Sequence, residues 1–419
     1  MALDTERSRV AHLLRRAGFG ATAAELEQYT ALGFAGALER LLDPEQVDES
    51  AAEQPPPIDP DPTNRDTRRR IEPAKLWWLG RMLATQRPLR EKMALFWHTH
   101  FATANSKVKN APLMLNQIQL FREAGLGSFE TLLQKVTRDP AMLIWLDNRQ
   151  NRKTAPNENY AREVMELFTV GLGNYSEDDV KAAARAFTGH TLDRSFQYNF
   201  NPNQHDFSDK TFMGQTGAFD ADDILAILVR QPATARFITT KLFRFFVHDH
   251  PEPATIDRLA AMFTSSGFEI RSVLGDLFSG PEFLSPAAFH AQIRQPVDLV
   301  IGSLKALDVQ AVGPDVVATL RRMGEDLLDP PDVSGWKGGP AWINSSTLFA
   351  RFNFAAKLAM TTAVSADPAP VDHYLTLLVD DDVTPEARAA LLNYLGDASE
   401  PKPHGLVHLV MCLPTYQLG

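Results

Sequence analysis

The chain has 419 residues, 44% of them hydrophobic, and carries a formal net charge of -10 at pH 7. A chain of this length exceeds one ordinary hydrophobic core, so it can form one large domain or two closely packed lobes. The acidic balance argues against a nucleic-acid-binding protein, because neutralising phosphates needs a basic face. The single cysteine, Cys412, excludes an internal disulfide and any thiolate metal cluster made within one chain.

No targeting or membrane signal stands out in the sequence. Residues 1–20 have no apolar stretch of the kind found in signal peptides, and no later apolar run reaches the length of a membrane span. The sequence therefore predicts a soluble, most simply cytoplasmic protein with no membrane span.

The N-terminal region is expected to begin with a short amphipathic helix over residues 5–16, which residues 17–20 interrupt before a second helix. His12, Arg15 and Arg16 lie close to this break. The arginines either complement the C-terminal end of the helix dipole or form an anion clamp, since a guanidinium can hold a carboxylate or phosphate with two parallel hydrogen bonds.

Two histidines follow the proline-rich segment QPPPIDPDPTNRDTRRR, which is expected to be an exposed loop. Residues 73–102 predict two helices rich in apolar side chains, broken near residues 87–88. His98 and His100 lie at their end. On a continuous helix, residues two apart diverge by roughly 200°, so the pair cannot easily share a metal ion. Either one of them binds a metal or both are buried and hydrogen-bonded.

The centre of the chain predicts a helical hairpin. Residues 158–170 form a helix after Pro156, and Ser176 begins a second helix that runs to about residue 188. The first helix has a polar face made of Glu158, Asn159, Arg162, Glu163 and Glu166. This face is either solvated or the wall of a site. Asp147, Asn148 and Asn157 precede the helix, where exposed N–H groups favour an anionic ligand.

The segment NENYAREVMELFTVGLGNYSEDDVKAAARAFTG resembles the central signature of a large bacterial family catalogued only as a domain of unknown function. Further motifs resemble the same family: HLLRRAGFG, FWHTHFAT, HDFSDKTFMG and PPDVSGWKGGPAWINSSTLFARFNF. The resemblance spans nearly the whole chain. It implies a sulfatase-like protein partner, beside which members are often described, but no settled reaction.

A small β hairpin is predicted near residues 196–213. Residues 196–200 alternate enough to form a strand, and residues 210–213 are expected to pair with them. His205 and Asp206 lie in the connection, where a titratable pair is either a catalytic dyad or part of a turn that the aspartate stabilises.

The second half of the chain predicts mainly helices. They are expected over residues 220–247 (two helices), 254–264, 270–279, 287–307, 316–323, 345–358 and 385–412 (two helices). An ordered loop at residues 329–344 interrupts them. Trp336 and Trp342 in this loop offer large rigid surfaces, either for packing or for a ligand.

Together these elements predict a mainly all-α, multi-helix globular fold with one small β hairpin. We expect N-terminal helices over residues 1–53, an exposed loop over 54–72, a central motif-bearing lobe over 73–215, and a C-terminal helical lobe over 216–419 packed on it.

Three functions are compatible with these residues. The first is a metal-dependent enzyme, an oxidoreductase or hydrolase, in which helices project histidines and carboxylates onto a divalent transition metal. The chain lacks the compact His-Glu-x-x-His and Glu-x-x-His patterns that make such a site strong from sequence alone. The second is a metal-free acid/base enzyme that acts on an anionic or polyol-like substrate, a small molecule or a polymer. The third is a non-catalytic scaffold or maturation partner.

The candidate residues are expected to converge on one cavity, with Arg162 held between Glu158 or Glu166 and a second acidic partner. The catalytic candidates are Arg16, Arg162, Glu163, Glu166, His205 and Asp206. The substrate-binding candidates are His12, Asn157, Glu158 and Trp336. The metal-ligand candidates are His98, His100, Glu163 and His205.

Overall fold

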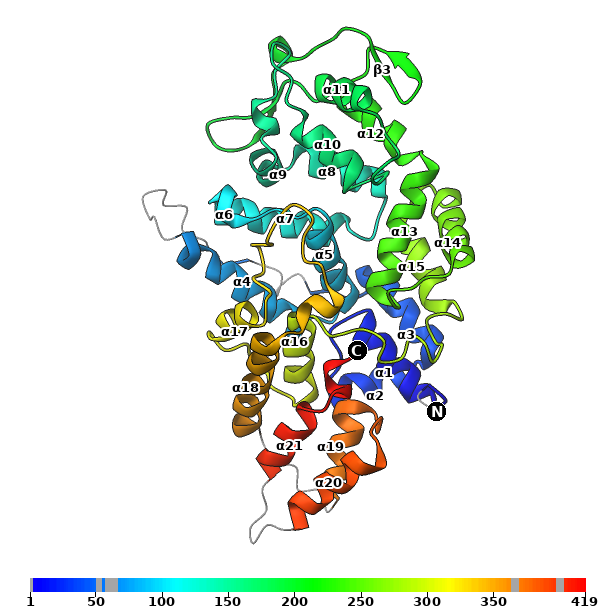
Figure 1. Cartoon of the computed structure of the whole chain (residues 1–419), viewed down its shortest axis with the longest axis vertical. Coiled ribbons are helices and arrows are strands. Elements are labelled where there is room, and N and C mark those ends of the chain that lie inside the picture. The colour runs from blue at the N-terminus through cyan, green and yellow to red at the C-terminus, as the bar shows by residue number, and fades with distance from the viewer. Residues whose placement is uncertain (1–2, 50–54, 57–66, 363–368, 397–402) are drawn as a thin grey trace.

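The computed structural model describes residues 3–49, 55–56, 67–362, 369–396 and 403–419. These residues fold mainly into α-helices, with two small antiparallel sheets, which confirms the predicted fold class. The molecule is elongated, and both termini lie in its lower half (Figure 1). None of the described helices is both long enough and apolar enough to cross a membrane.

Three N-terminal helices lie in the lower half of the molecule: α1 (Glu6–Arg16), α2 (Ala23–Ala31) and α3 (Gly33–Leu42). Helix α1 begins after Thr5, whose side chain accepts a hydrogen bond from the Ser8 backbone N–H. The Ser8 side chain in turn accepts a hydrogen bond from the Thr5 backbone N–H, so the capping box satisfies both of these N–H groups.

The middle of the molecule contains α4 (Thr67–Ala84), α5 (Pro88–His100), α6 (Asn105–Val108) and α7 (Ala111–Ala124). The predicted exposed loop over 54–72 is wrong at its end, because residues 67–72 already belong to α4. Arginine is a good helix former, and the proline taken as the start of the helix lies inside it. Most of the remaining predicted loop lies outside the described residues.

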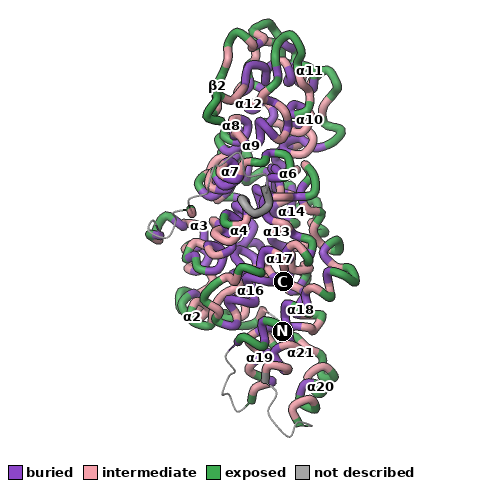
Figure 2. The backbone as a smooth tube through the Cα atoms, turned by 90° about the vertical axis from the view of Figure 1, so that its left-hand side faces the viewer, coloured by how far each residue is buried: buried purple, intermediate pink, exposed green. Residues whose placement is uncertain are grey.

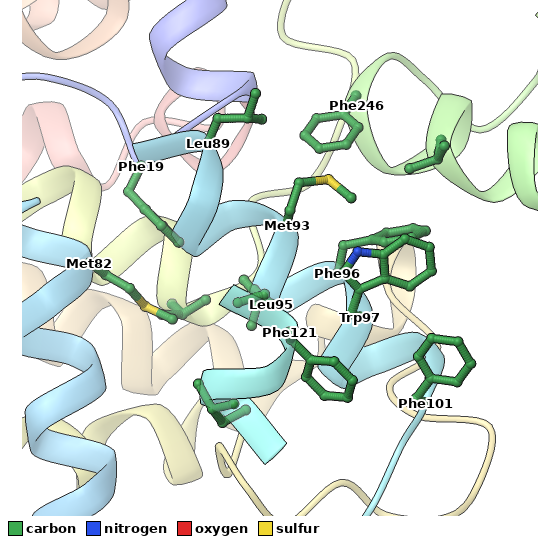
Figure 3. Close-up of a cluster of buried hydrophobic side chains, with 14 of the residues drawn as sticks. Phe19, Met82, Leu89, Met93, Leu95, Phe96, Trp97, Phe101, Phe121 and Phe246 are labelled. Carbon is green, nitrogen blue, oxygen red and sulfur yellow. The ribbon is translucent and has the colours of Figure 1, made fainter. Parts of the chain in front are cut away.

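Helix α5 forms the centre of the core (Figure 3). Leu89, Met93, Leu95 and Trp97 are all fully buried, so this helix is covered on every side rather than on one face. The Trp97 indole N–H donates to the Gly125 carbonyl oxygen at 2.8 Å. A Cβ atom at Gly125 would lie 2.7 Å from the Trp97 ring, so only glycine allows the end of α7 to pass this close.

The upper end of the molecule contains α8 (Phe129–Arg138), α9 (Pro140–Trp145), α10 (Glu158–Glu166) and α11 (Glu177–Ala186). Helices α10 and α11 pack together as the predicted helical hairpin. The capping box at Ser176 is present, as expected from its sequence.

The strands at residues 198–200 and 210–212 do not pair with each other, so the predicted pairing is wrong. Strand β1 (His190–Leu192) pairs with β2 (Tyr198–Phe200), and β3 (Lys210–Phe212) pairs with β4 (Gln215–Gly217). The Asp193 carboxylate accepts from two backbone N–H groups in the β1–β2 turn. Short local turns therefore form two small hairpins in place of one long connection.

Helices α12 (Ala221–Val229), α13 (Pro232–Phe246), α14 (Pro253–Ser265) and α15 (Ile270–Ser279) descend along one side of the molecule (Figure 1). They agree with the helices predicted over residues 220–279. Helix α13 carries Lys241, which lines the candidate site.

The lower half contains α16 (Pro296–Ala306), α17 (Val316–Arg322), α18 (Ser345–Thr361), α19 (Pro370–Val379), α20 (Pro385–Gly396) and α21 (Pro403–Met411). The helix predicted over 287–307 begins only at Pro296, whose fixed φ angle suits a first helical turn. Buried backbone runs through the middle of the molecule, while exposed loops lie at its upper end (Figure 2).

Candidate functional site

Two adjoining cavities lie near some of the candidate residues, and the larger is bounded by α5, α13 and the loop of residues 329–344. It has a volume of about 280 Å³. We call it the aromatic cavity. Its lining includes Phe96, His100, Lys241, Asp249, Trp336 and Trp342.

The loop reaches the cavity because it passes directly against the end of α5. At Gly335, with φ +78°, an added Cβ would lie 2.3 Å from the Thr99 carbonyl oxygen. His98 holds the start of the loop, since its Nε2 accepts a hydrogen bond from the Leu328 N–H at 3.0 Å. The Trp336 ring packs edge-on against His98, with 5.5 Å between the ring centroids. His98 therefore positions Trp336 through this ring contact and through its hydrogen bond to the start of the loop.

His100 and Lys241 form the polar end of the aromatic cavity. The His100 Nε2 lies 3.1 Å from the Phe168 carbonyl oxygen, which requires the N–H on that nitrogen. Its Nδ1 is then free to accept from Lys241 Nζ at 3.1 Å. Lys241 also donates to the Leu167 carbonyl oxygen at 3.1 Å.

The buried environment changes the protonation of both groups. Burial, followed by the charge of Lys241, holds the pKa of His100 well below its usual value. Burial alone lowers the pKa of Lys241 to about 8. No carboxylate contributes to that shift, although Asp249 lines the same cavity. His100 is thus a neutral acceptor, and Lys241 is an amine that titrates near neutral pH.

The smaller cavity lies between α1 and the C-terminal helices and has a volume of about 90 Å³. We call it the arginine cavity, because Arg7, Arg15, Arg16 and Arg294 line it. Phe245, Gln292, Ile293 and Asp298 line both cavities, so the two spaces share one wall.

Three of the residues predicted for the site lie at these cavities. Arg16 lines the arginine cavity, and His100 and Trp336 line the aromatic cavity. His12, four residues before Arg16, is fully buried but does not line either cavity. Its Nε2 bonds to the Phe283 carbonyl oxygen at 3.1 Å, and its ring packs on Phe283. Burial, with Arg16 nearby, holds the pKa of His12 well below its usual value.

The polar face of α10 does not reach either cavity, so the predicted convergence of all candidates is wrong. Arg162 makes two hydrogen bonds to Glu177, both at 2.8 Å, and lies 3.5 Å from Glu158. The second acidic partner of Arg162 is therefore Glu177, from the next helix. Glu166 instead accepts a hydrogen bond from the Tyr175 hydroxyl group at 2.5 Å. Burial, followed by the charge of Glu166, raises the pKa of Glu163.

We expect Arg162→Ala to lower the free energy of unfolding by no more than about 1 kcal/mol, the upper range for exposed ion pairs. The side chains of Arg162 and Glu177 are 35% and 66% exposed, so solvent screens their attraction. Chemical denaturation of both proteins measures the difference. A loss several times larger would mean that the α10 face is closed from solvent in solution.

The remaining candidates in the upper half serve local structure. His205 Nδ1 lies 2.8 Å from the Thr188 carbonyl oxygen, and the His205 ring packs against Phe207. Asp206 accepts from Arg185 Nε at 2.7 Å. Burial would raise the pKa of Asp206, but hydrogen bonds from Arg185 and Ser208 lower it overall.

Asn157 caps the N-terminus of α10 and accepts from the Asn159 N–H at 2.9 Å. Glu158, which is half-buried, follows it as the first helical residue. The Asn157 side chain therefore satisfies one of the free backbone N–H groups at this helix start.

The predicted metal ligands do not share a site. His98, His100 and His205 each have a ring nitrogen bonded to a different backbone group. Within the described ranges, no three histidine, cysteine, aspartate or glutamate side chains are grouped so that they could hold one metal ion. Among the residues that the structure describes, the predicted ligands therefore do not form one shared metal site.

Sequence reasoning missed the principal residue of the aromatic cavity. Phe237, Lys241 and Phe245 are spaced four residues apart on α13 and so form one row of the helix. A lysine within a row of phenylalanines was the available signal. The Lys241 Nζ also lies 4.6 Å from the centre of the Phe237 ring.

Comparison with known proteins places the chain in a family. The model of the family described as "Protein of unknown function (DUF1800)" matches residues 12–418. The comparisons found no match among curated proteins and none among solved structures. The match covers nearly the whole chain, including the segments that carry Arg16, His100, Lys241 and Trp336, so the chain belongs to this family.

Proposed function

We propose that this protein is a metal-free acid/base enzyme that acts on a polyol-like substrate in the aromatic cavity, with Lys241 as the proton-transferring group. The observation that carries the proposal is the setting of Lys241. Its amine lines a cavity, lacks a carboxylate counter-ion in the described structure, and has a pKa of about 8. A general base is most effective when its pKa lies near the working pH.

The hydrogen bonds of Lys241 suit a base. A neutral amine keeps two hydrogens, and these can still be donated to His100 Nδ1 and the Leu167 carbonyl oxygen. The lone pair of Nζ then points away from these two hydrogen bonds and can accept a proton from the bound substrate. His100 is a positioning residue in this scheme, because both of its ring nitrogens already bond to protein groups.

The remaining walls suit a ligand with hydroxyl groups on an apolar carbon frame. Trp336, Trp342 and Phe96 offer flat surfaces for C–H groups. The Asp249 carboxylate and the Gln295 amide line the same space and can bond to hydroxyl groups. Aromatic walls with a few polar groups are typical of small-molecule sites.

Solvent hydrogen exchange tests the proposal without knowledge of the final product. A panel of aldoses, ketoses and sugar acids is incubated with the protein in D₂O, and deuterium uptake at the carbon next to the carbonyl group, where the C–H bond is acidic, is followed by NMR. We expect exchange to rise with pH through about 8, as Lys241 loses its proton. Lys241→Met should reduce the rate by about 10²- to 10⁴-fold, the usual contribution of a general base.

The matched control is Lys357→Met. This variant removes an exposed lysine of α18 that is paired with Asp315. It should leave the exchange rate unchanged. Full activity in Lys241→Met would overturn the proposal. Binding without exchange in the parent would favour the scaffold for a sulfatase-like partner. Stoichiometric metal in untagged protein, lost in His205→Ala, would favour the metal-dependent enzyme.

A further inference from the structure

The arginine cavity has an excess of positive charge among its described lining residues. The cationic side chains are Arg7, Arg15, Arg16, Lys92 and Arg294. Only two carboxylate side chains, those of Asp298 and Asp380, line the same space. Gly419 also lines it, and even a carboxylate at that residue would leave the cations in excess.

Part of the carboxylate charge is already paired. Asp298 accepts from Lys92 Nζ at 2.6 Å, and Asp380 lies 2.5 Å from Arg15 Nη1. Arg16 is only 5% exposed, and its guanidinium bonds to the Val247 carbonyl oxygen and to Gln292. Those partners are neutral. The positive charge of Arg16 therefore has no hydrogen-bonded carboxylate within the described structure.

Several buried N–H groups at this cavity have no protein partner among the described residues. They are Arg16 Nε together with Arg15 Nε and Nη2. A buried N–H without an acceptor destabilises the folded state, and the free-energy cost is larger when the donor is charged. Burial, followed by repulsion from Arg15, lowers the pKa of Arg16 to about 9, which reflects the same crowding of cations. An anion would relieve both the missing bonds and the repulsion.

We propose that the arginine cavity binds one tetrahedral oxyanion, phosphate or sulfate, through Arg15 and Arg16, with Arg7 at its exposed rim. A volume of about 90 Å³ leaves room for one such group. Guanidinium groups match these oxygens with paired hydrogen bonds.

The position of the cavity suggests where the oxyanion comes from. Gln292 lines both cavities, and its Oε1 accepts from Arg16 at 2.6 Å while its Nε2 donates to the Arg244 carbonyl oxygen. An ester group in the arginine cavity could extend its carbon frame into the aromatic cavity only past the residues that line both spaces. The oxyanion site itself stands without the proposed function, and only its use as a substrate subsite rests on that proposal.

Isothermal titration calorimetry tests the site with inorganic phosphate and inorganic sulfate at constant ionic strength. We expect binding to the parent and a loss of about tenfold or more in Arg15→Gln, because a hydrogen bond to a charged group contributes enough for that factor. Arg7→Gln, at an exposed position, should weaken binding by a smaller factor without affecting the fold. Arg194→Gln, which removes the same charge in the distant β1–β2 turn, should bind as the parent does.

No binding of either ion, or an equal loss in Arg194→Gln, would overturn the proposal. Glucose 6-phosphate separates the two sources of the oxyanion. Tighter binding of the ester than of phosphate, with that advantage lost in Trp336→Ala, supports a substrate subsite. Equal binding of both supports a site for the free ion. Failure of the Lys241 exchange experiment leaves these titrations unaffected, so the two proposals fail separately.

Discussion

Glu91→Ala is expected to lower the free energy of unfolding by about 3–5 kcal/mol, the usual cost of removing one partner of a buried ion pair. Glu91 is fully buried, and its Oε1 accepts from Arg122 Nε at 2.8 Å. Its Oε2 accepts from the Trp78 indole N–H at 3.1 Å. The variant would remove the hydrogen bond between the Glu91 carboxylate and the buried guanidinium of Arg122, and would open a cavity beside Trp78. Urea unfolding measures the loss.

Two further variants give this experiment its controls. Glu91→Gln keeps the shape and the acceptor for Trp78 but removes the charge, so it should lie between the parent and Glu91→Ala. Asp178→Ala removes a carboxylate that is 91% exposed and should change stability by less than about 1 kcal/mol. A loss in Glu91→Ala no greater than that in Asp178→Ala would contradict the buried network.

The contribution of Glu325 to the stability of the protein is expected to fall as the pH rises from about 4.5 to about 8, because this residue ionises inside the core. Glu325 is 1% exposed, and burial raises its pKa from 4.5 to about 8 despite a hydrogen bond from the Val297 N–H. The folded state binds the proton more tightly than the unfolded state, so this contribution is fully present below 4.5 and is lost through 8.

Glu325→Gln removes this dependence, because glutamine keeps an acceptor for the Val297 N–H but never ionises. The variant should be more stable than the parent by a few kcal/mol at about pH 9 and equal to it at about pH 4, since each pKa unit corresponds to about 1.4 kcal/mol. Urea unfolding at both pH values measures the difference. Asp139, whose pKa burial raises to about 7, leaves a residual slope in both proteins. Equal pH slopes in parent and variant would refute the expectation.

Most helices could be predicted because their signals are local. The caps at Thr5, Ser176 and Asp220 accept hydrogen bonds within the first turn, and Pro88 and Pro232 begin helices where a missing N–H has no cost. These effects act within a few residues, so a single sequence contains them.

The strand pairing could not be predicted in the same way. The strand periodicity located two strands correctly but did not show which segments would pair with them. Turn chemistry at Asp193 and at Met213, which has φ 45°, favours pairing of each strand with its near neighbour in the chain. The turns over residues 193–197 and 213–214 are both shorter than the connection over 201–209 that we expected, so they cost less chain entropy.

The site was predicted in part. The sequence alone identified Arg16, His100 and Trp336 as candidates from their motifs. It also placed residues from the polar face of α10 among the site candidates, although Arg162 on this face forms a solvent-accessible ion pair with Glu177. An amphipathic helix shows which residues avoid the core, but not whether their face meets solvent or a cavity.

By itself, the sequence determined the helical class, most helix boundaries and the absence of an internal disulfide, because each depends on composition or on contacts between near neighbours. Only the tertiary structure decided which polar residues share a site. It placed Lys241 of α13 against His100 of α5, and brought Arg16 of α1 to the same wall through Gln292. The physical reason is that burial, which lowers the pKa of Lys241 and leaves donors of Arg16 unpaired, arises from elements far apart in the chain.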